Sequence, residues 1–231
     1  MITQAIRGDH CRHHLLSVDE KTGIQALERI EARAPESKGR HRRREFEYKR
    51  NGTTCLIAAF DVGQGNIVTE RIHPTRTEED FVEFIKESVD TFPVEDEIVF
   101  LADQLNTHMS ETLVKYVARI IDFREDLGKK GRIGILKNME SRKTFLENSN
   151  HRVRFVFTPK HCSWLNPVEN WFSKLQRHII KNGNFSSVKE LEDKIKDYIK
   201  FYNRCLVKPL NWKFQGFDEN KLLNNFVVSK T

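Results

Sequence analysis

Three acidic residues stand where a strand is expected to end or a helix to begin: Asp19, Asp103 and Glu169. Carboxylates that converge on one place repel each other strongly unless divalent cations lie among them. Ligation by oxygen alone favours magnesium or manganese. If the fold brings the three side chains together, their types predict a metal site.

Each of these residues also has a simpler interpretation. Asp19 suits a hairpin turn, and Asp103 suits the turn before a loop of Gln, Asn and Thr. Glu169 lies three residues after a good helix cap, where a glutamate completes a capping box and is favoured by the helix dipole. The sequence pattern by itself leaves both interpretations open.

The residues around the first two carboxylates predict strands. A short apolar run at 15–18 leads into Asp19, and Lys21-Thr22-Gly23 is a plausible turn that would end this strand. Two β-rich runs then flank the turn at 62–65, which is typical of a hairpin. The continuous apolar run at 98–101 predicts a strand buried on both faces, with Asp103 after it.

Glu169 is expected in the first turn of a helix. Residues 153–157 alternate as a half-buried strand does, and Thr158-Pro159 ends that strand. Asn166 is a good N-cap and Pro167 suits the first helical position. Apolar residues then recur at helical spacing toward a core, at Val168, Phe172, Leu175 and Ile179.

Three further helices are predicted, and together the elements suggest a topology. Thr77 with Asp80 and Ser187 with Glu190 have the spacing of capping boxes, and Ser110 caps a helix between them. The order of strands and helices predicts a mixed α/β sheet whose first and fourth strands are adjacent and parallel. Carboxylates that follow those strands would then meet at one edge of the sheet.

Composition predicts one main domain. The chain has 231 residues and 38% hydrophobic content, enough for one sizeable core. It has no apolar run of about 18 residues and no signal-peptide pattern, so we expect a cytoplasmic, nucleoid-associated protein without a membrane span.

The four cysteines form no C-x-x-C pair, which argues against a disulfide framework and a zinc ribbon. His10-Cys11 and His161-Cys162 are adjacent pairs, but the His and Cys residues are otherwise scattered, so a His/Cys metal protein is disfavoured.

Positive charge is clustered in two segments. Residues 38–50 hold seven Lys or Arg against two Glu, and residues 129–160 hold nine against two. Such clusters suit a polyanion, although an ordinary solvated surface remains an alternative for each. Residues 31–45 lack an apolar period and are expected to form a mobile basic loop that nucleic acid could order.

Five strings occur in order: LLSVDEKTGIQ, EFEYKRNGTTCLIAAFDV, LADQLNTH, RFVFTPKHCSWLNPVENWFSKLQR and NFSSVKEL. Together they resemble the catalytic domain of DDE transposases, in the mariner-like branch of bacterial insertion sequences called the insertion sequence six-thirty family. The resemblance covers residues 15–214. It implies an α/β, RNase H-like fold with a mixed five-stranded sheet flanked by helices, in which two Asp and one Glu hold two magnesium (or manganese) ions.

The resemblance also implies an activity and site residues. The activity is metal-dependent cleavage of DNA phosphodiesters at transposon ends, followed by strand transfer, with Asp19, Asp103 and Glu169 as catalytic metal ligands. The expected partners are double-stranded DNA, a second copy of the chain on that DNA, and an N-terminal helix-turn-helix portion. Candidate DNA contacts are Arg42, Arg43, Arg44, Lys160, His161, Trp164, Lys174 and Arg177. Candidate supporting residues around the ligands are Gln104, Asn106, His108 and Asn166, with His108 and His161 able to orient phosphates.

The expected organisation is a lead-in at 1–14, the catalytic domain at 15–214 with a basic insertion at 124–150, and a tail at 215–231. Two features depart from the family pattern: Gln104 stands where Asn is commoner, and the insertion lengthens the spacing from Asp103 to Glu169. No helix-turn-helix precedes Asp19, so a truncated or split element is expected. A nuclease of the same fold and an inactive, DNA-binding or dimerising regulator are the alternatives.

Overall fold

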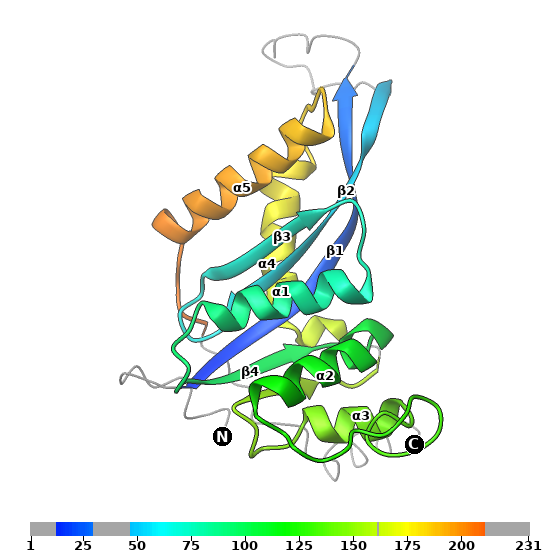
Figure 1. The fold of residues 1–231 in the computed structure, drawn as a ribbon. Coiled ribbons are helices and arrows are strands. Elements are labelled where there is room, and N and C mark those ends of the chain that lie inside the picture. Colours follow the sequence, from blue (N-terminus) through cyan, green and yellow to red (C-terminus); the bar gives the residue numbers. More distant parts are fainter. Residues whose placement is uncertain (1–12, 30–46, 161, 211–231) are drawn as a thin grey trace, which may run out of the picture.

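A computed structural model describes residues 13–29, 47–160 and 162–210 (Figure 1). Its centre is a five-stranded sheet in the order β3-β2-β1-β4-β5. The mixed five-stranded sheet predicted from the sequence is therefore confirmed. The strands are β1 (His13–Arg29), β2 (Tyr48–Asp61), β3 (Ile67–His73), β4 (Glu97–Ala102) and β5 (Val153–Phe157).

Strand pairing determines which residues meet at the edge of the sheet where the candidate site lies. β1 pairs antiparallel with β2, and β2 pairs antiparallel with β3, as the hairpin signal at 62–65 predicts. β1 pairs in parallel with β4 from His13 opposite Glu97 to Ser17 opposite Leu101. β4 in turn pairs in parallel with β5. The first and fourth strands are therefore adjacent and parallel, so that Asp19 and Asp103 come to the same edge.

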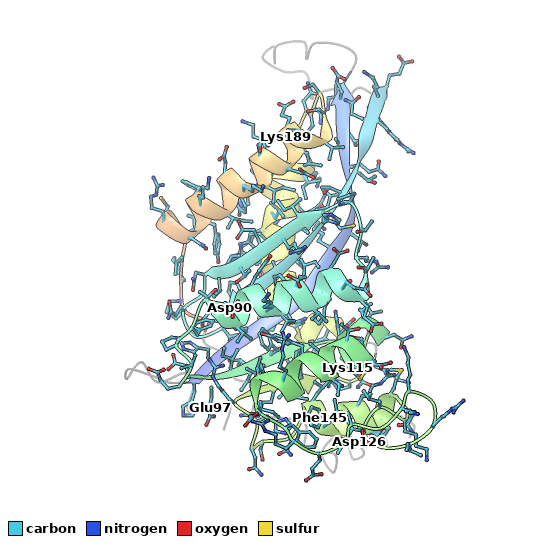
Figure 2. The ribbon with its side chains drawn as sticks, viewed as in Figure 1. Asp90, Glu97, Lys115, Asp126, Phe145 and Lys189 are labelled. Carbon is cyan, nitrogen blue, oxygen red and sulfur yellow. The ribbon has the colours of Figure 1, made fainter. Side chains whose placement is uncertain are left out.

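Helices cover both faces of the sheet (Figure 1). One apolar core joins the sheet to α1 (Glu78–Asp90), α2 (Glu111–Ile120) and α3 (Met139–Leu146). A second core joins its other face to α4 (Pro167–Leu175) and α5 (Val188–Cys205). Figure 2 labels Lys115 on the first layer and Lys189 on the second. Short 3-10 segments occur at Asn106–Met109 and Ser163–Leu165, and a π-helical turn at Gln176–Ile180 follows α4.

The helix caps agree with the sequence in most places. Thr77 and Asp80 form the predicted capping box of α1, and Ser110 caps α2 by accepting from the Leu113 backbone N–H. Ser187 caps α5, but the predicted reciprocal bond is wrong. The Glu190 carboxylate instead accepts from the backbone N–H and the hydroxyl of Ser186. The insertion at 124–150 contains the short helix α3.

The turn predicted at Lys21-Thr22-Gly23 is wrong, because β1 continues through it to Arg29. The pairing with β2 shifts register between Lys21 and Ile24 and then resumes. Gly23 has φ of +63°, a conformation that costs glycine little and other residues more. The turn-forming residues therefore produce a bulge, since β2 supplies hydrogen-bond partners on both sides of it.

Several predictions lie outside the described residues: residues 1–12 of the lead-in, the whole basic loop at 31–45 and the chain beyond 210. Within the described ranges, no helix is long and apolar enough to cross a membrane. Cys55, Cys162 and Cys205 are free thiols.

Candidate active site

The start of α4 is fixed directly onto β1. The Ser17 hydroxyl accepts a hydrogen bond from the Val168 backbone N–H at 2.8 Å and donates to Asn166 Oδ1. Asn166 occupies the N-cap position, but its own side chain makes no capping bond. The predicted capping role of the Asn166 side chain is therefore wrong, and Ser17, 151 positions before Val168, performs it.

Asn166 instead links the helix start to the first carboxylate. Its Nδ2 donates to the Val18 carbonyl at 2.8 Å and to Asp19 Oδ2 at 3.2 Å. The other Asp19 oxygen, Oδ1, accepts from the Glu20 backbone N–H at 2.8 Å. Asp19 is thus held on both oxygens, and Asn166 lies beside it as predicted.

Asp19 is buried, with 8% of its surface exposed. Burial raises the pKa of Asp19 to about 7, and the negative charges of Asp103 and Glu169 add to this rise. The Glu20 backbone N–H and the charge of His108 oppose it. The three carboxylates predicted from the sequence therefore act electrostatically on one another.

Asp103 follows β4 and lies half-buried at the same edge. Its Oδ1 accepts from the Leu105 backbone N–H at 3.1 Å and lies 2.7 Å from His108 Nδ1. Burial raises the pKa of the Asp103 carboxyl, but the hydrogen bond and charge of His108 outweigh burial, so the pKa is lowered. The environments of the two aspartates thus shift their pKa values in opposite directions.

Glu169 lies in the first turn of α4, where its backbone N–H bonds the Asn166 carbonyl at 3.1 Å. Its half-buried carboxylate accepts no hydrogen bond from any described residue, and α4 has no capping box. The structural interpretation of Glu169 as a capping-box residue is therefore wrong. The side chain keeps its oxygens available.

The chemistry of this donor set fits a hard divalent cation. All three candidate ligands are carboxylates, and the repulsion that raises the pKa of Asp19 is what a cation would relieve. Among the residues that the structure describes, no three His, Cys, Asp or Glu side chains form a ready-made metal cluster. The three carboxylates therefore lie near enough to interact electrostatically, but they do not form a finished coordination site.

Sequence reasoning missed Glu20, which is a fourth carboxylate at this edge. Its side chain is 3% exposed and lies between two cations, with Oε1 3.6 Å from His108 Nε2 and Oε2 3.4 Å from the Arg76 guanidinium. The alternation of β1 contains the signal, because Leu16, Val18 and Glu20 share one face of the strand. Because residues 21–23 were interpreted as a turn, Glu20 was not recognised as part of this strand face.

His108 was predicted as a supporting residue able to orient phosphates. It is fully buried, so it cannot contact a phosphate, and that part of the prediction is wrong. Burial opposes its protonation, but the hydrogen bond to Asp103 and the negative charges of Asp103 and Glu20 raise the pKa of His108 to about 9. The imidazole lies between two carboxylates.

The other two predicted supporting residues differ in their contacts. Gln104 Nε2 donates to the Thr158 carbonyl at 2.9 Å, which ties the loop after β4 to the end of β5. Asn106 is exposed at the start of a 3-10 segment. Gln104 therefore shapes the edge of the sheet on which Asp103 stands.

The candidate DNA-contacting residues divide into three groups. Lys160, Trp164 and Arg177 are exposed, and Trp164 has 74% of its surface exposed, so it is not packed against the protein. Lys174 is half-buried and lies 5.3 Å from the centre of the Tyr202 ring, so part of its role is packing. The remaining four, Arg42, Arg43, Arg44 and His161, lie outside the described residues.

A protein-family profile described as DDE superfamily endonuclease matches residues 14–192, which is most of the chain. The chain belongs to this family. The resemblance found in its sequence is thereby confirmed, and the matched range of this DDE endonuclease includes Asp19, Asp103 and Glu169.

Three solved structures of Mos1 share the fold of this DDE endonuclease. The Mos1 mariner paired end complex with Mn has 13% identity and a TM-score of 0.52, covering 82% of this chain and 50% of that one. A pre-cleavage Mos1 transpososome has 11% identity and a TM-score of 0.51, covering 88% and 54%. A Mos1 transposase paired-end complex with left transposon end has 13% identity and a TM-score of 0.50, with the same coverage.

This chain therefore spans about half the length of the Mos1 chains that it matches. A search of curated proteins found no match. At these identities the likeness establishes the RNase H-like fold.

The raised pKa values predict how the stability of the metal-free DDE endonuclease depends on pH. In the folded chain Asp19 keeps its proton up to about pH 7, whereas the ordinary pKa of this carboxyl is 3.8. Protonated Asp19 therefore adds to the free energy of unfolding at low pH, and this contribution is lost as pH rises from 3.8 to about 7. The contribution of His108 is present below pH 6.5 and is lost as pH rises through about 9. We expect the free energy of unfolding in chelator to fall as pH rises from about 5 to 8.

Urea unfolding of the wild type and of Asp19→Ala in chelator measures this effect. Asp61, Glu70 and Glu147 also have raised pKa values, so the difference between the two curves is the informative quantity. We expect that difference to change with pH below about 7 and to level off above it. A difference that is independent of pH would contradict the assignment to Asp19. Asp193→Ala, at an exposed site on α5, serves as the control.

Proposed function

We propose that this chain is the catalytic domain of a transposase that cleaves DNA phosphodiesters at transposon ends and transfers the freed strands to target DNA. The observation that carries the proposal is the convergence of Asp19, Asp103 and Glu169 at one edge of the sheet. The parallel pairing of β1 with β4 brings the two aspartates there, and the bond from Val168 to Ser17 fixes the start of α4 there. Membership of the DDE superfamily endonucleases supports it. So does the shared fold with transposase structures bound to transposon ends.

In this proposal, Asp19, Asp103 and Glu169 hold two magnesium or manganese ions. When bound, such ions activate a water or a 3′-hydroxyl as the nucleophile and stabilise the leaving oxygen. The protein fixes the ligands in advance. Asn166 and the Glu20 backbone hold Asp19, Leu105 and His108 hold Asp103, and the bond from Val168 to Ser17 fixes the helix that carries Glu169.

We further propose that the exposed side chains beside this edge hold the DNA. Lys160 and Arg177 would neutralise phosphates, which position DNA without reading its sequence. Trp164 presents an exposed indole on which an unpaired base could stack. The unmatched half of the Mos1 chains leaves room for a separate helix-turn-helix portion, and we propose that the active form is a dimer on DNA.

A nuclease of the same fold is the second candidate, because family membership specifies an endonuclease and cleavage alone needs the same carboxylates. A labelled duplex with an exposed 3′-hydroxyl is incubated with the chain, supercoiled plasmid and magnesium or manganese. A transposase joins the label to the plasmid, and a nuclease only nicks the plasmid. If DNA is bound but neither product forms with either ion, the chain is an inactive, DNA-binding fragment and the proposal is wrong.

A further inference from the structure

We propose that Glu20 and His108 form a buried positioning pair that holds the Asp103 carboxylate in its metal-binding orientation. This inference rests on the proposed function, because it assigns a role to two residues behind one of the proposed ligands. Neither residue would touch DNA or the ions. Both would act through Asp103.

The His108 ring is fixed before any ligand binds. It is fully buried, its centre lies 4.3 Å from that of the Phe81 ring, and its backbone N–H bonds the Leu105 carbonyl. Its Nδ1 faces Asp103 Oδ1 at 2.7 Å, where the Leu105 backbone N–H also donates. Oδ1 therefore has two donors, whereas Oδ2 accepts no hydrogen bond from the described residues. These contacts at Oδ1 therefore leave Oδ2 as the Asp103 oxygen that is available to an ion.

Glu20 completes the arrangement from the opposite side of the ring. Its Oε1 and His108 Nε2 are both buried, and neither has a hydrogen-bond partner in the described parts of the chain. They lie 3.6 Å apart, facing each other. A buried polar atom without a partner is unfavourable, so each is the available partner of the other. The ring therefore faces a carboxylate at each end, Asp103 at Nδ1 and Glu20 at Nε2.

Arg76 anchors Glu20 from the solvent side. Its guanidinium lies 3.4 Å from Glu20 Oε2, the oxygen that does not face His108. The order is therefore Arg76, Glu20, His108 and Asp103, running from the surface to the site. Adjacent residues of a strand point to opposite faces, which lets Asp19 serve as a ligand while Glu20 reaches behind the second ligand.

Two substitutions of His108 separate positioning from mere packing. In His108→Asn, the amide nitrogen takes roughly the place of Nδ1 and can still donate to Asp103. In His108→Gln, it takes roughly the place of Nε2 and reaches toward Glu20 instead. Loss of a group that orients a metal ligand typically weakens metal binding about 10–100-fold. A packing role would lower stability in both variants without separating their metal affinities.

The measurement is the affinity for Mn²⁺ alone, by calorimetry without DNA, alongside thermal melts. We expect His108→Gln to bind Mn²⁺ about 10–100-fold more weakly than the wild type, and His108→Asn to recover most of that loss. His151→Gln, at a buried histidine that packs on Phe145, is the matched control. Glu20→Leu, which removes the partner of Nε2, should weaken Mn²⁺ binding about tenfold, whereas Glu20→Gln keeps an acceptor and should weaken it less.

If His108→Gln does not fold, the two Glu20 variants carry the test. A wild-type chain that binds Mn²⁺ with variants of unchanged affinity would overturn this inference and leave the proposed function standing. Equal losses in His108→Asn and His108→Gln would also overturn it. A wild-type chain that binds no Mn²⁺ would overturn both.

Discussion

Replacing Asp103 with alanine is expected to reduce metal-dependent DNA cleavage by at least about a thousandfold, equivalent to about 4 kcal/mol in the activation barrier. We expect Asp19→Ala and Glu169→Ala to have effects of the same size. In a two-ion site the ligands act as a unit, so the loss of any one displaces an ion from the reacting phosphate. Plasmid nicking with magnesium or manganese measures the loss.

The folded structure should survive these substitutions. Asp103 and Glu169 are both half-buried, and Glu169 accepts no hydrogen bond from the described residues. Thermal melts of Asp19→Ala and Glu169→Ala in chelator should therefore match the wild type or rise slightly, since a repelling charge has been removed. Asp103→Ala should melt somewhat lower, because buried His108 loses its partner. Asp193→Ala removes an exposed carboxylate that pairs with Lys189 on the surface of α5, and it should cleave normally. Normal cleavage by any one of the three site variants would exclude that residue from the site.

The sequence predicted the elements whose signals are local. The run at 98–101 is apolar throughout because β4 is buried on both faces, and Asp103 follows it. Thr77 and Asp80 lie three residues apart, so one pattern specifies both halves of the α1 capping box. The parallel pairing of β1 with β4 was also predicted from the sequence, because a crossover helix between strands favours that arrangement.

Features that depend on distant partners could not be predicted. Lys21-Thr22-Gly23 carries turn-forming residues, but hydrogen bonds from β2 keep the strand continuous through them. Ser17 caps α4 across 151 positions, so no local pattern reveals it. Glutamate is usually exposed to solvent, and the burial of Glu20 depends on Arg76 and His108, which belong to other parts of the chain. Ser17, Glu20 and residues 21–23 all lie within four positions of Asp19, but each feature depends on residues far away in the chain.

DNA binding by this chain is expected to weaken steeply with salt, by about a hundredfold between about 50 and 200 mM if four phosphates are neutralised. The reason is the part of the basic insertion that precedes α3, which contains Asp126 (Figure 2). Five of its cationic side chains are exposed: Arg124, which pairs with Asp122, and Lys129, Lys130, Arg132 and Lys137. Each phosphate contact releases a condensed counterion, so the logarithm of affinity falls linearly with the logarithm of salt concentration.

A matched pair of fourfold variants separates this surface from net charge. Changing Lys129, Lys130, Arg132 and Lys137 together to alanine should reduce the salt slope by about three to four units, because each phosphate contributes about 0.9. The control changes four exposed lysines of α5, the helix that carries Lys189 in Figure 2, and removes the same charge: Lys189, Lys194, Lys196 and Lys200.

We expect the α5 variant to keep nearly the wild-type slope, because the lysines of α5 lie on the opposite helical layer from the insertion. Fluorescence anisotropy with a duplex of arbitrary sequence, titrated at several salt concentrations, gives all three slopes. Equal reductions in the two variants would mean that overall charge, not the insertion, drives binding. A wild-type affinity that does not change with salt would exclude phosphate contacts as the main source of affinity.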